Sequence, residues 1–164
     1  MGRQAYVPPS GSHQIAGVLF FTEDSHQCGP ASLAALMAFH GKKVSPQQVA
    51  LAVYRPDLKG SLNLDLMLYA RAQGLCAEWR QGSHQELAER LGQGQPLMVL
   101  VDNGLGPVKK LHYMVVTGYS AQAVQVNSGL HQGMQITWPD FLSAWGRTNY
   151  AVLLVRSPGK GGCP

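Results

Sequence analysis

The 164-residue sequence is poor in charged residues, which make up 13% of it. Typical globular domains contain about 25%. Hydrophobic residues account for 45% of the chain. This balance favours a compact globular body and argues against a disordered chain. A chain of this length is expected to fold as one domain and to bury a sizeable core without a metal or a disulfide staple.

The sequence also lacks membrane and targeting signals. It contains no run of about 18 apolar residues, so no transmembrane helix is expected. Residues 1–14 include an arginine but no apolar core, unlike a signal peptide. Two localisations therefore stay open: the cytoplasm for the chain as it stands, or the periplasm or an exported state if a signal peptide has been removed.

Basic residues are scattered along the chain. The net charge is +4 at pH 7, but the only adjacent basic pairs are Lys42-Lys43 and Lys109-Lys110. No basic run is interleaved with aromatic side chains, which argues against nucleic-acid binding. The three cysteines, Cys28, Cys76 and Cys163, lack metal-ligand spacing, so neither a metal nor another cofactor is expected.

The order of predicted elements places helices first and most strands second. Residues 1–16 are polar and rich in proline and glycine, which predicts an extended arm, and residues 158–164 predict a flexible tail. Residues 17–157 lie between them and predict a single domain. Helical patterns fill much of residues 28–91, whereas residues 96–156 contain successive strands. This order is typical of the α+β class, with helices packed on an antiparallel sheet.

Several short signals mark element boundaries. Ser45 and Asn63 each stand where a helix N-cap is expected. Ser83, with Glu86 three residues later, matches a capping box. The short apolar run at residues 17–21 predicts an edge strand.

Cys28 stands at the predicted start of the first helix, in the segment Gln-Cys-Gly-Pro-Ala-Ser-Leu. Unpaired backbone N–H groups and the positive end of the helix dipole favour a thiolate there. The thiolate is the nucleophilic form of cysteine. Gly29 would let a substrate carbonyl approach the backbone closely. The alternative is a buried cysteine that only packs, which is common in proteins.

His112 lies near the start of a strand predicted over residues 111–119. A histidine in that position alone is more often a structural residue. A helix-start cysteine upstream changes this interpretation, because a Cys–His pair needs the imidazole on a rigid element facing the thiol. His26 is less suited as the base, since it shares a short segment with Cys28.

A third member of the site depends on the register of a hairpin. With Tyr119 and Ser120 at its tip, His112 would lie opposite Asn127, with the Cβ atoms about 5 Å apart. An amide in that position would hold the imidazole tautomer. A shift of one residue would turn Asn127 to the other face. The alternative is that residues 127–129 form a turn.

Four segments together resemble C39-like peptidases, and most closely the stand-alone bacterial members. They are residues 27–31 (QCGPA), 60–62 (GSL), 70–75 (ARAQGL) and 112–119 (HYMVVTGY). The resemblance extends over roughly residues 20–155. It implies a papain-like fold and the cleavage of peptide bonds, which occurs after a double glycine in the transporter-fused members.

The chain departs from this family pattern at two places. Relatives usually carry an oxyanion-hole glutamine a few residues before the nucleophile, whereas this chain has Thr22 and Glu23 there and Gln27 next to the cysteine. Relatives usually have an aspartate followed by proline as the third catalytic residue, whereas this chain has Asn127-Ser128.

The sequence therefore predicts a cysteine peptidase that acts on a peptide or protein substrate and needs no metal. Cys28 is the predicted nucleophile, His112 the base, Asn127 the residue that orients it, and Gln27 an oxyanion donor. Residues 60–62 are expected near the cleft. Two alternatives stay open: an acyltransferase or amidase with the same Cys–His pair, and a degenerate peptidase that binds a peptide without cutting it.

Overall fold

The computed structural model describes residues 6–22 and 26–164. The elements in chain order are β1 (His13–Gln14), α1 (Cys28–Phe39), α2 (Pro46–Val53), β2 (Tyr54–Arg55), β3 (Gly60–Ser61), α3 (Asn63–Ala72), β4 (Cys76–Gln81), α4 (His84–Gly92), β5 (Leu97–Asp102), β6 (Leu111–Tyr119), β7 (Ala123–Ser128), β8 (His131–Thr137), α5 (Trp138–Gly146) and β9 (Ala151–Arg156). Within these ranges, none of the helices has the length and hydrophobicity needed to cross a membrane.

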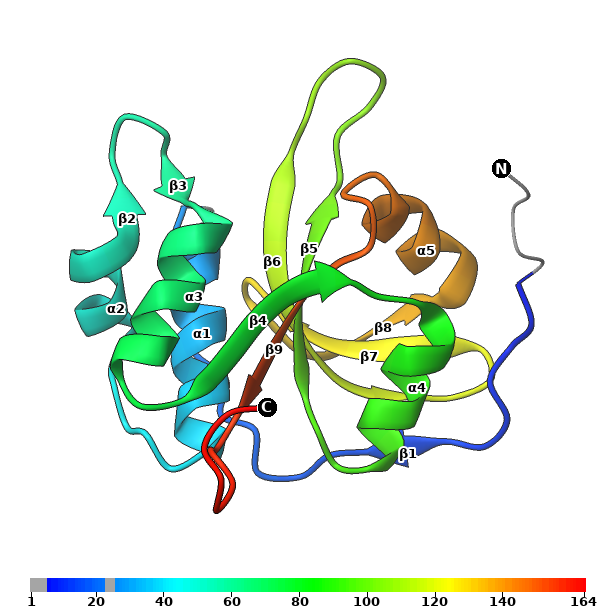
Figure 1. Ribbon diagram of the computed structural model, residues 1–164. Coiled ribbons are helices and arrows are strands. Elements are labelled where there is room, and N and C mark those ends of the chain that lie inside the picture. The colour runs from blue at the N-terminus through cyan, green and yellow to red at the C-terminus, as the bar shows by residue number, and fades with distance from the viewer. Residues whose placement is uncertain (1–5, 23–25) are drawn as a thin grey trace.

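One antiparallel sheet organises the molecule. Its strands run in the order β4-β9-β5-β6-β7-β8, and β1 pairs with β6 outside this path. Strands β2 and β3 form a separate small hairpin. Helices α1, α2 and α3 gather beside one half of the sheet, and α4 and α5 pack in a second group (Figure 1). The predicted α+β class is confirmed.

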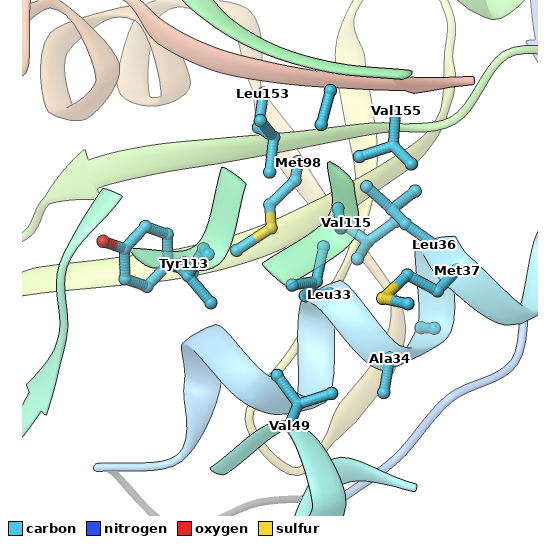
Figure 2. Close-up of a cluster of buried hydrophobic side chains, with 14 of the residues drawn as sticks. Leu33, Ala34, Leu36, Met37, Val49, Met98, Tyr113, Val115, Leu153 and Val155 are labelled. Atoms are coloured by element: carbon cyan, nitrogen blue, oxygen red, sulfur yellow. The ribbon is translucent and has the colours of Figure 1, made fainter. Parts of the chain in front are cut away.

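The side chains of β5 pack alternately into two hydrophobic cores. Met98 packs in the first core with Leu33 of α1 and Leu153 of β9 (Figure 2). Val99 packs in the second core with Trp138 of α5. A strand covered on both faces is apolar at every position, which explains the continuous hydrophobic run of β5.

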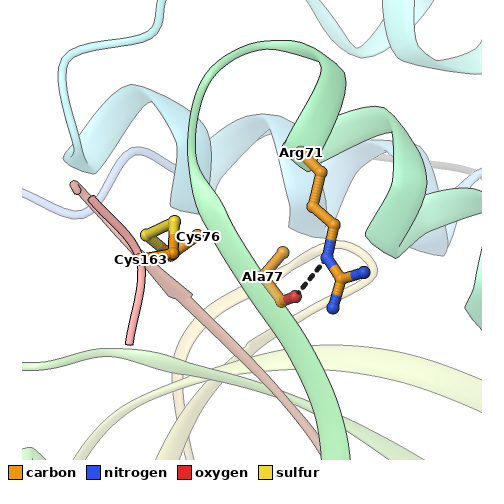
Figure 3. Close-up of a disulfide and its surroundings, with 4 residues drawn as sticks. All are labelled: Arg71, Cys76, Ala77 and Cys163. Atoms are coloured by element: carbon orange, nitrogen blue, oxygen red, sulfur yellow. Dashed lines mark hydrogen bonds between the residues drawn. A yellow bond between two sulfur atoms is a disulfide. The ribbon is translucent and has the colours of Figure 1, made fainter.

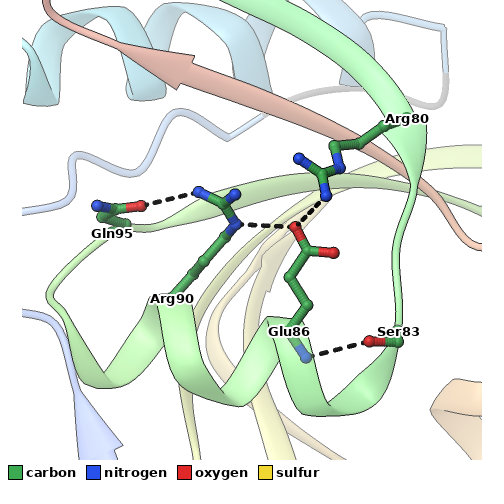
Figure 4. A network of polar contacts seen from close by, with 5 residues as sticks. All are labelled: Arg80, Ser83, Glu86, Arg90 and Gln95. Carbon is green, nitrogen blue, oxygen red and sulfur yellow. Dashed lines mark hydrogen bonds and ion pairs between the residues drawn. The ribbon is translucent and has the colours of Figure 1, made fainter. Parts of the chain in front are cut away.

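Two of the predicted helix caps are present. Ser45 forms a full capping box at the start of α2. Ser83 accepts a hydrogen bond from the Glu86 backbone N–H, as predicted. The Glu86 carboxylate, however, binds Arg90 at 2.9 Å and Arg80 at 3.3 Å (Figure 4). Two arginines thus bind the Glu86 side chain, which in a full capping box would accept a hydrogen bond from the Ser83 backbone N–H.

Two other local predictions are wrong. Asn63 is the first residue of α3, and Leu62 is its N-cap. The Asn63 side chain accepts a hydrogen bond from the Tyr113 hydroxyl, which explains why it does not cap the helix. Residues 17–21 form no strand. They run beside α1, where the last two of them line a cavity.

The connection between β6 and β7 is longer than the predicted two-residue turn. Tyr119 pairs with Val124, so several residues form the loop. The Ser120 hydroxyl accepts hydrogen bonds from the backbone N–H groups of Gln122 and Ala123 and stabilises this wider loop.

This wider loop changes the register that places the candidate site. The pairing shifts again at a bulge within residues 116–118. Val115 therefore lies opposite Asn127, and the predicted pairing of His112 with Asn127 is wrong.

The C-terminal tail is covalently attached to the sheet. Cys163 forms a disulfide with Cys76, the first residue of β4 (Figure 3). Gly159 and Gly162 form an isolated bridge that turns the chain back. The segment predicted as a flexible tail is thus attached to the sheet at Cys163. Cys28 lies outside this disulfide.

Candidate active site

Cys28 is the first residue of α1 and is 7% exposed. Gln27 is the N-cap, and its side chain makes no capping hydrogen bond. The Gln27 carbonyl accepts the first helical hydrogen bond, from Ala31 N–H at 3.0 Å. The thiol therefore lies at the positive end of the helix dipole, which favours the thiolate.

The start of α1 packs tightly against β3 and β6. A Cβ atom built on Gly29 would lie 3.3 Å from Cδ2 of Tyr113 and 3.4 Å from Cβ of Ser61. Glycine fits this narrow space without displacing either neighbour. Ser61 therefore lies beside the residue that follows Cys28, as predicted for residues 60–62.

The Tyr113 side chain ties three elements together beside the thiol. Its single hydroxyl proton is shared between two acceptors, the Asn63 Oδ1 at 2.5 Å and the Ser61 carbonyl at 3.1 Å. Burial raises the pKa of Tyr113, and the nearby Cys28 adds to this shift. Tyr113 therefore keeps its proton and acts as a rigid donor that fixes β6 against the start of α3.

His112 precedes Tyr113 on β6 and lies at the same end of the strand. Its Nε2 is 2.7 Å from Oγ of Ser128, the last residue of β7. Burial lowers the pKa of His112, and the positive charge of Lys110 lowers it further. Both effects favour the neutral imidazole, one ring nitrogen of which is held by a hydroxyl.

Asn127 is buried on β7, and its Oδ1 accepts a hydrogen bond from Gly133 N–H at 2.9 Å. It lies opposite Val115 and lines a small cavity with Ala31 and Ser32 of α1. The structure brings Ser128 to the His112 ring in the place where the sequence analysis expected Asn127. The sequence pointed to the pair Asn127-Ser128. The observed register brings Ser128, rather than Asn127, to the His112 ring.

Gln27 lines a large cavity of about 970 Å³ beside α1 and α2. Apolar and aromatic side chains share its wall with neutral polar ones, among them Phe20, Phe21, Thr22, Gln27, Leu51 and Tyr54. Gln27 and Ala31 line this cavity, so it adjoins the start of α1. Among the residues that the structure describes, no group of three histidine, cysteine, aspartate or glutamate side chains could hold a metal ion.

Solved structures show the same fold at low sequence identity. A putative C39-like peptidase from Bacillus anthracis is 16% identical with a TM-score of 0.76, covering 92% of this chain and 100% of that one. A double glycine motif protease from an AMS/PCAT transporter, in complex with the leader peptide, is 22% identical with a TM-score of 0.68, covering 88% and 94%. The cysteine protease CMS1MS2 of Carica candamarcensis is 14% identical with a TM-score of 0.63, covering 89% and 98%.

These similarities confirm the papain-like fold. No functionally curated protein matches the chain. The sequence model of the Peptidase_C39 like family matches residues 12–152, which include the start of α1 and the whole of β6. The chain therefore belongs to the Peptidase_C39 like family.

Proposed function

We propose that the chain is a thiol hydrolase that cleaves peptide bonds, with Cys28 as nucleophile and His112 as general base. One observation carries this proposal: Gly29, next to the thiol, packs against Tyr113, which is next to the imidazole. Cys28 and His112, which are distant in the sequence, are thus each adjacent to one of two residues that pack together where α1 begins. In the tautomer in which Nε2–H donates to the Ser128 hydroxyl, Nδ1 is the nitrogen that takes the thiol proton.

The reaction follows from these positions. The Cys28 sulfur attacks the substrate carbonyl carbon while His112 takes the thiol proton. The Cys28 backbone N–H and the Gln27 side chain stabilise the oxyanion. The C–N bond then breaks, and His112 returns the proton to the leaving amine. Water, activated by the same imidazole, hydrolyses the resulting thioester.

The surroundings of the thiol suit a peptide substrate. The cavity beside Gln27 offers an apolar wall with neutral polar groups, which matches an extended peptide segment. The relative from an AMS/PCAT transporter carries a leader peptide in its structure. We therefore assign the substrate to the class of peptides or unfolded protein segments.

Incubation with a peptide library, analysed by mass spectrometry, tests this function. Cys28→Ala should remove turnover, and His112→Ala should lower it by about 10²–10⁴-fold, the usual contribution of a general base. The matched control is His13→Ala, which changes an exposed histidine on β1 and should leave turnover intact. Activity within a few-fold of wild type for Cys28→Ala or His112→Ala would contradict the mechanism.

A binding module is the second candidate function, because Ser128 provides no carboxylate to the His112 imidazole. This function predicts that library peptides bind and stay intact, and that His112→Ala leaves the alkylation rate of Cys28 unchanged. An acyltransferase would instead transfer the acyl group to an added amine. Analysis of the library products separates these outcomes from hydrolysis.

A further inference from the structure

We propose that Ser128 is the positioning residue of His112, and that its neutral hydroxyl leaves Cys28 and His112 as an uncharged pair whose reactivity rises toward alkaline pH. This inference rests on the proposed function, because it concerns the protonation of the same pair. It assigns to Ser128 a role that the sequence analysis gave to Asn127.

The position of Ser128 supports this assignment. It ends β7 and pairs on its other side with His131 of β8, next to a bulge that follows Val126. Its Oγ lies 2.7 Å from Nε2 of His112, which is the length of a good hydrogen bond. Asn127, one residue earlier, is held by Gly133 N–H. The hydroxyl is thus the group that fixes the plane of the imidazole ring.

A hydroxyl acts on an imidazole differently from a carboxylate. An ionised carboxylate only accepts, so it selects the tautomer with hydrogen on Nε2 and leaves Nδ1 bare. The Ser128 hydroxyl both donates and accepts, so it is compatible with either tautomer of His112. It also carries no charge to stabilise an imidazolium. Ser128 therefore holds the ring in place without favouring a thiolate–imidazolium pair.

The surroundings of His112 also oppose a positive charge on its ring. Lys110 precedes it on the chain and opposes a positive charge on the ring, as does burial. Asp102 lies at the end of the neighbouring strand β5. Its carboxylate, however, accepts hydrogen bonds from the backbone N–H groups of Gly104 and Lys110. His131 lies opposite Ser128 and is exposed. Among the described residues, Tyr113 follows His112 on β6 and keeps its proton, and Cys28 contributes the thiol from α1.

The pH dependence of Cys28 alkylation by iodoacetamide tests the inference. In the wild type, the rate should keep rising as the pH increases through neutral, because the neutral Ser128 hydroxyl adds nothing to the thiolate-stabilising effect of the start of α1. Ser128→Asp places a carboxylate beside the ring, and such a neighbour favours the charged form by about 1–3 pKa units. We expect this variant to be alkylated about 10-fold faster or more at pH 6, with a plateau toward neutral pH.

Asn127→Asp is the matched control. It adds the same charge one residue away, and its carboxylate still accepts from Gly133 N–H. This variant should keep the wild-type pH profile. Coincident profiles for Ser128→Asp, Asn127→Asp and the wild type would overturn the inference.

A second pair of variants separates positioning from folding. Ser128→Thr keeps the hydroxyl and should retain peptide turnover, whereas Ser128→Ala should lower it. Equal turnover in both would overturn the role of Ser128 even if Ser128→Asp does not fold. The proposed function fails separately, if His112→Ala changes neither alkylation nor turnover. An effect of His112→Ala without any effect at Ser128 would reject the present inference alone.

Discussion

Lys110 stands two residues before His112 and places a positive charge near its imidazole. Together with burial, this charge lowers the pKa of His112, so the ring loses its proton at a lower pH than an ordinary histidine. We predict that Lys110→Ala raises the pKa of His112 toward about 6.5, the ordinary value. An NMR titration of the His112 ring measures this shift, and the acid limb of turnover should move to higher pH with it.

Lys109→Ala is the control for this prediction. Lys109 is adjacent in the sequence, and its charge acts on the carboxyl of Asp102 rather than on the His112 ring. It should change the pKa of His112 less than Lys110→Ala does. A His112 pKa that falls or stays constant in Lys110→Ala would show that the lysine charge does not reach the ring.

Residue chemistry led to the prediction of Cys28 and His112 as nucleophile and base. A cysteine at a helix start and a histidine at a strand start are visible in the sequence pattern. Ser128 was missed because its role depends on which residue of β7 reaches the ring. The register of β7 decides which residue reaches the ring, and the identity of one residue does not reveal this register.

At the scale of elements, the sequence predicted most helices and strands but not how β6 and β7 align. Apolar periodicity identified both strands because their core-facing side chains are buried. Their register instead depends on the hydrogen bonds that the Ser120 hydroxyl accepts from backbone N–H groups of the loop, and on the bulge at residues 116–118. These features arise from three-dimensional contacts that the alternation of apolar and polar residues does not record.

Gly118 lies in this bulged part of β6 and contacts β1. A Cβ atom built on Gly118 would lie 2.7 Å from the His13 carbonyl oxygen, which is closer than real Cβ contacts. We predict that Gly118→Ala displaces β1 and lowers the free energy of unfolding by about 1–3 kcal/mol, as overpacking does. Urea denaturation followed by circular dichroism measures the change.

The matched control is Gly161→Ala, in the C-terminal segment. A Cβ atom there would have nothing within 4 Å. Its urea midpoint should match that of the wild type. If Gly118→Ala also matched the wild type, the contact between β1 and β6 would contribute little to stability.

On the scale of the whole molecule, the disulfide between Cys76 and Cys163 joins residues 87 positions apart. Closing a loop of this size restricts the unfolded chain, and chain-entropy reasoning gives about 4–5 kcal/mol as the ideal stabilisation. Measured effects are commonly about 2–4 kcal/mol. We predict that Cys163→Ser lowers the free energy of unfolding by this smaller amount, measured by denaturation without reductant.

Adding a reductant to the wild type should reproduce the stability of Cys163→Ser, and the variant itself should not respond to the reductant. Cys28→Ser is the cysteine control, since Cys28 lies outside this disulfide. It should lose stability on reduction as the wild type does. A wild type whose unfolding is insensitive to reductant would contradict the role of the disulfide.

The same covalent bond closes part of the polypeptide into a ring and leaves the N-terminal segment outside it. The ring, from residue 76 to residue 163, contains His112 and Ser128, whereas Cys28 lies on the N-terminal segment. A single protease nick in the exposed segment 105–110 would therefore release no fragment. The nicked protein would run as one band on a non-reducing gel and as two bands after a thiol is added, and its proposed nucleophile and base would separate only then.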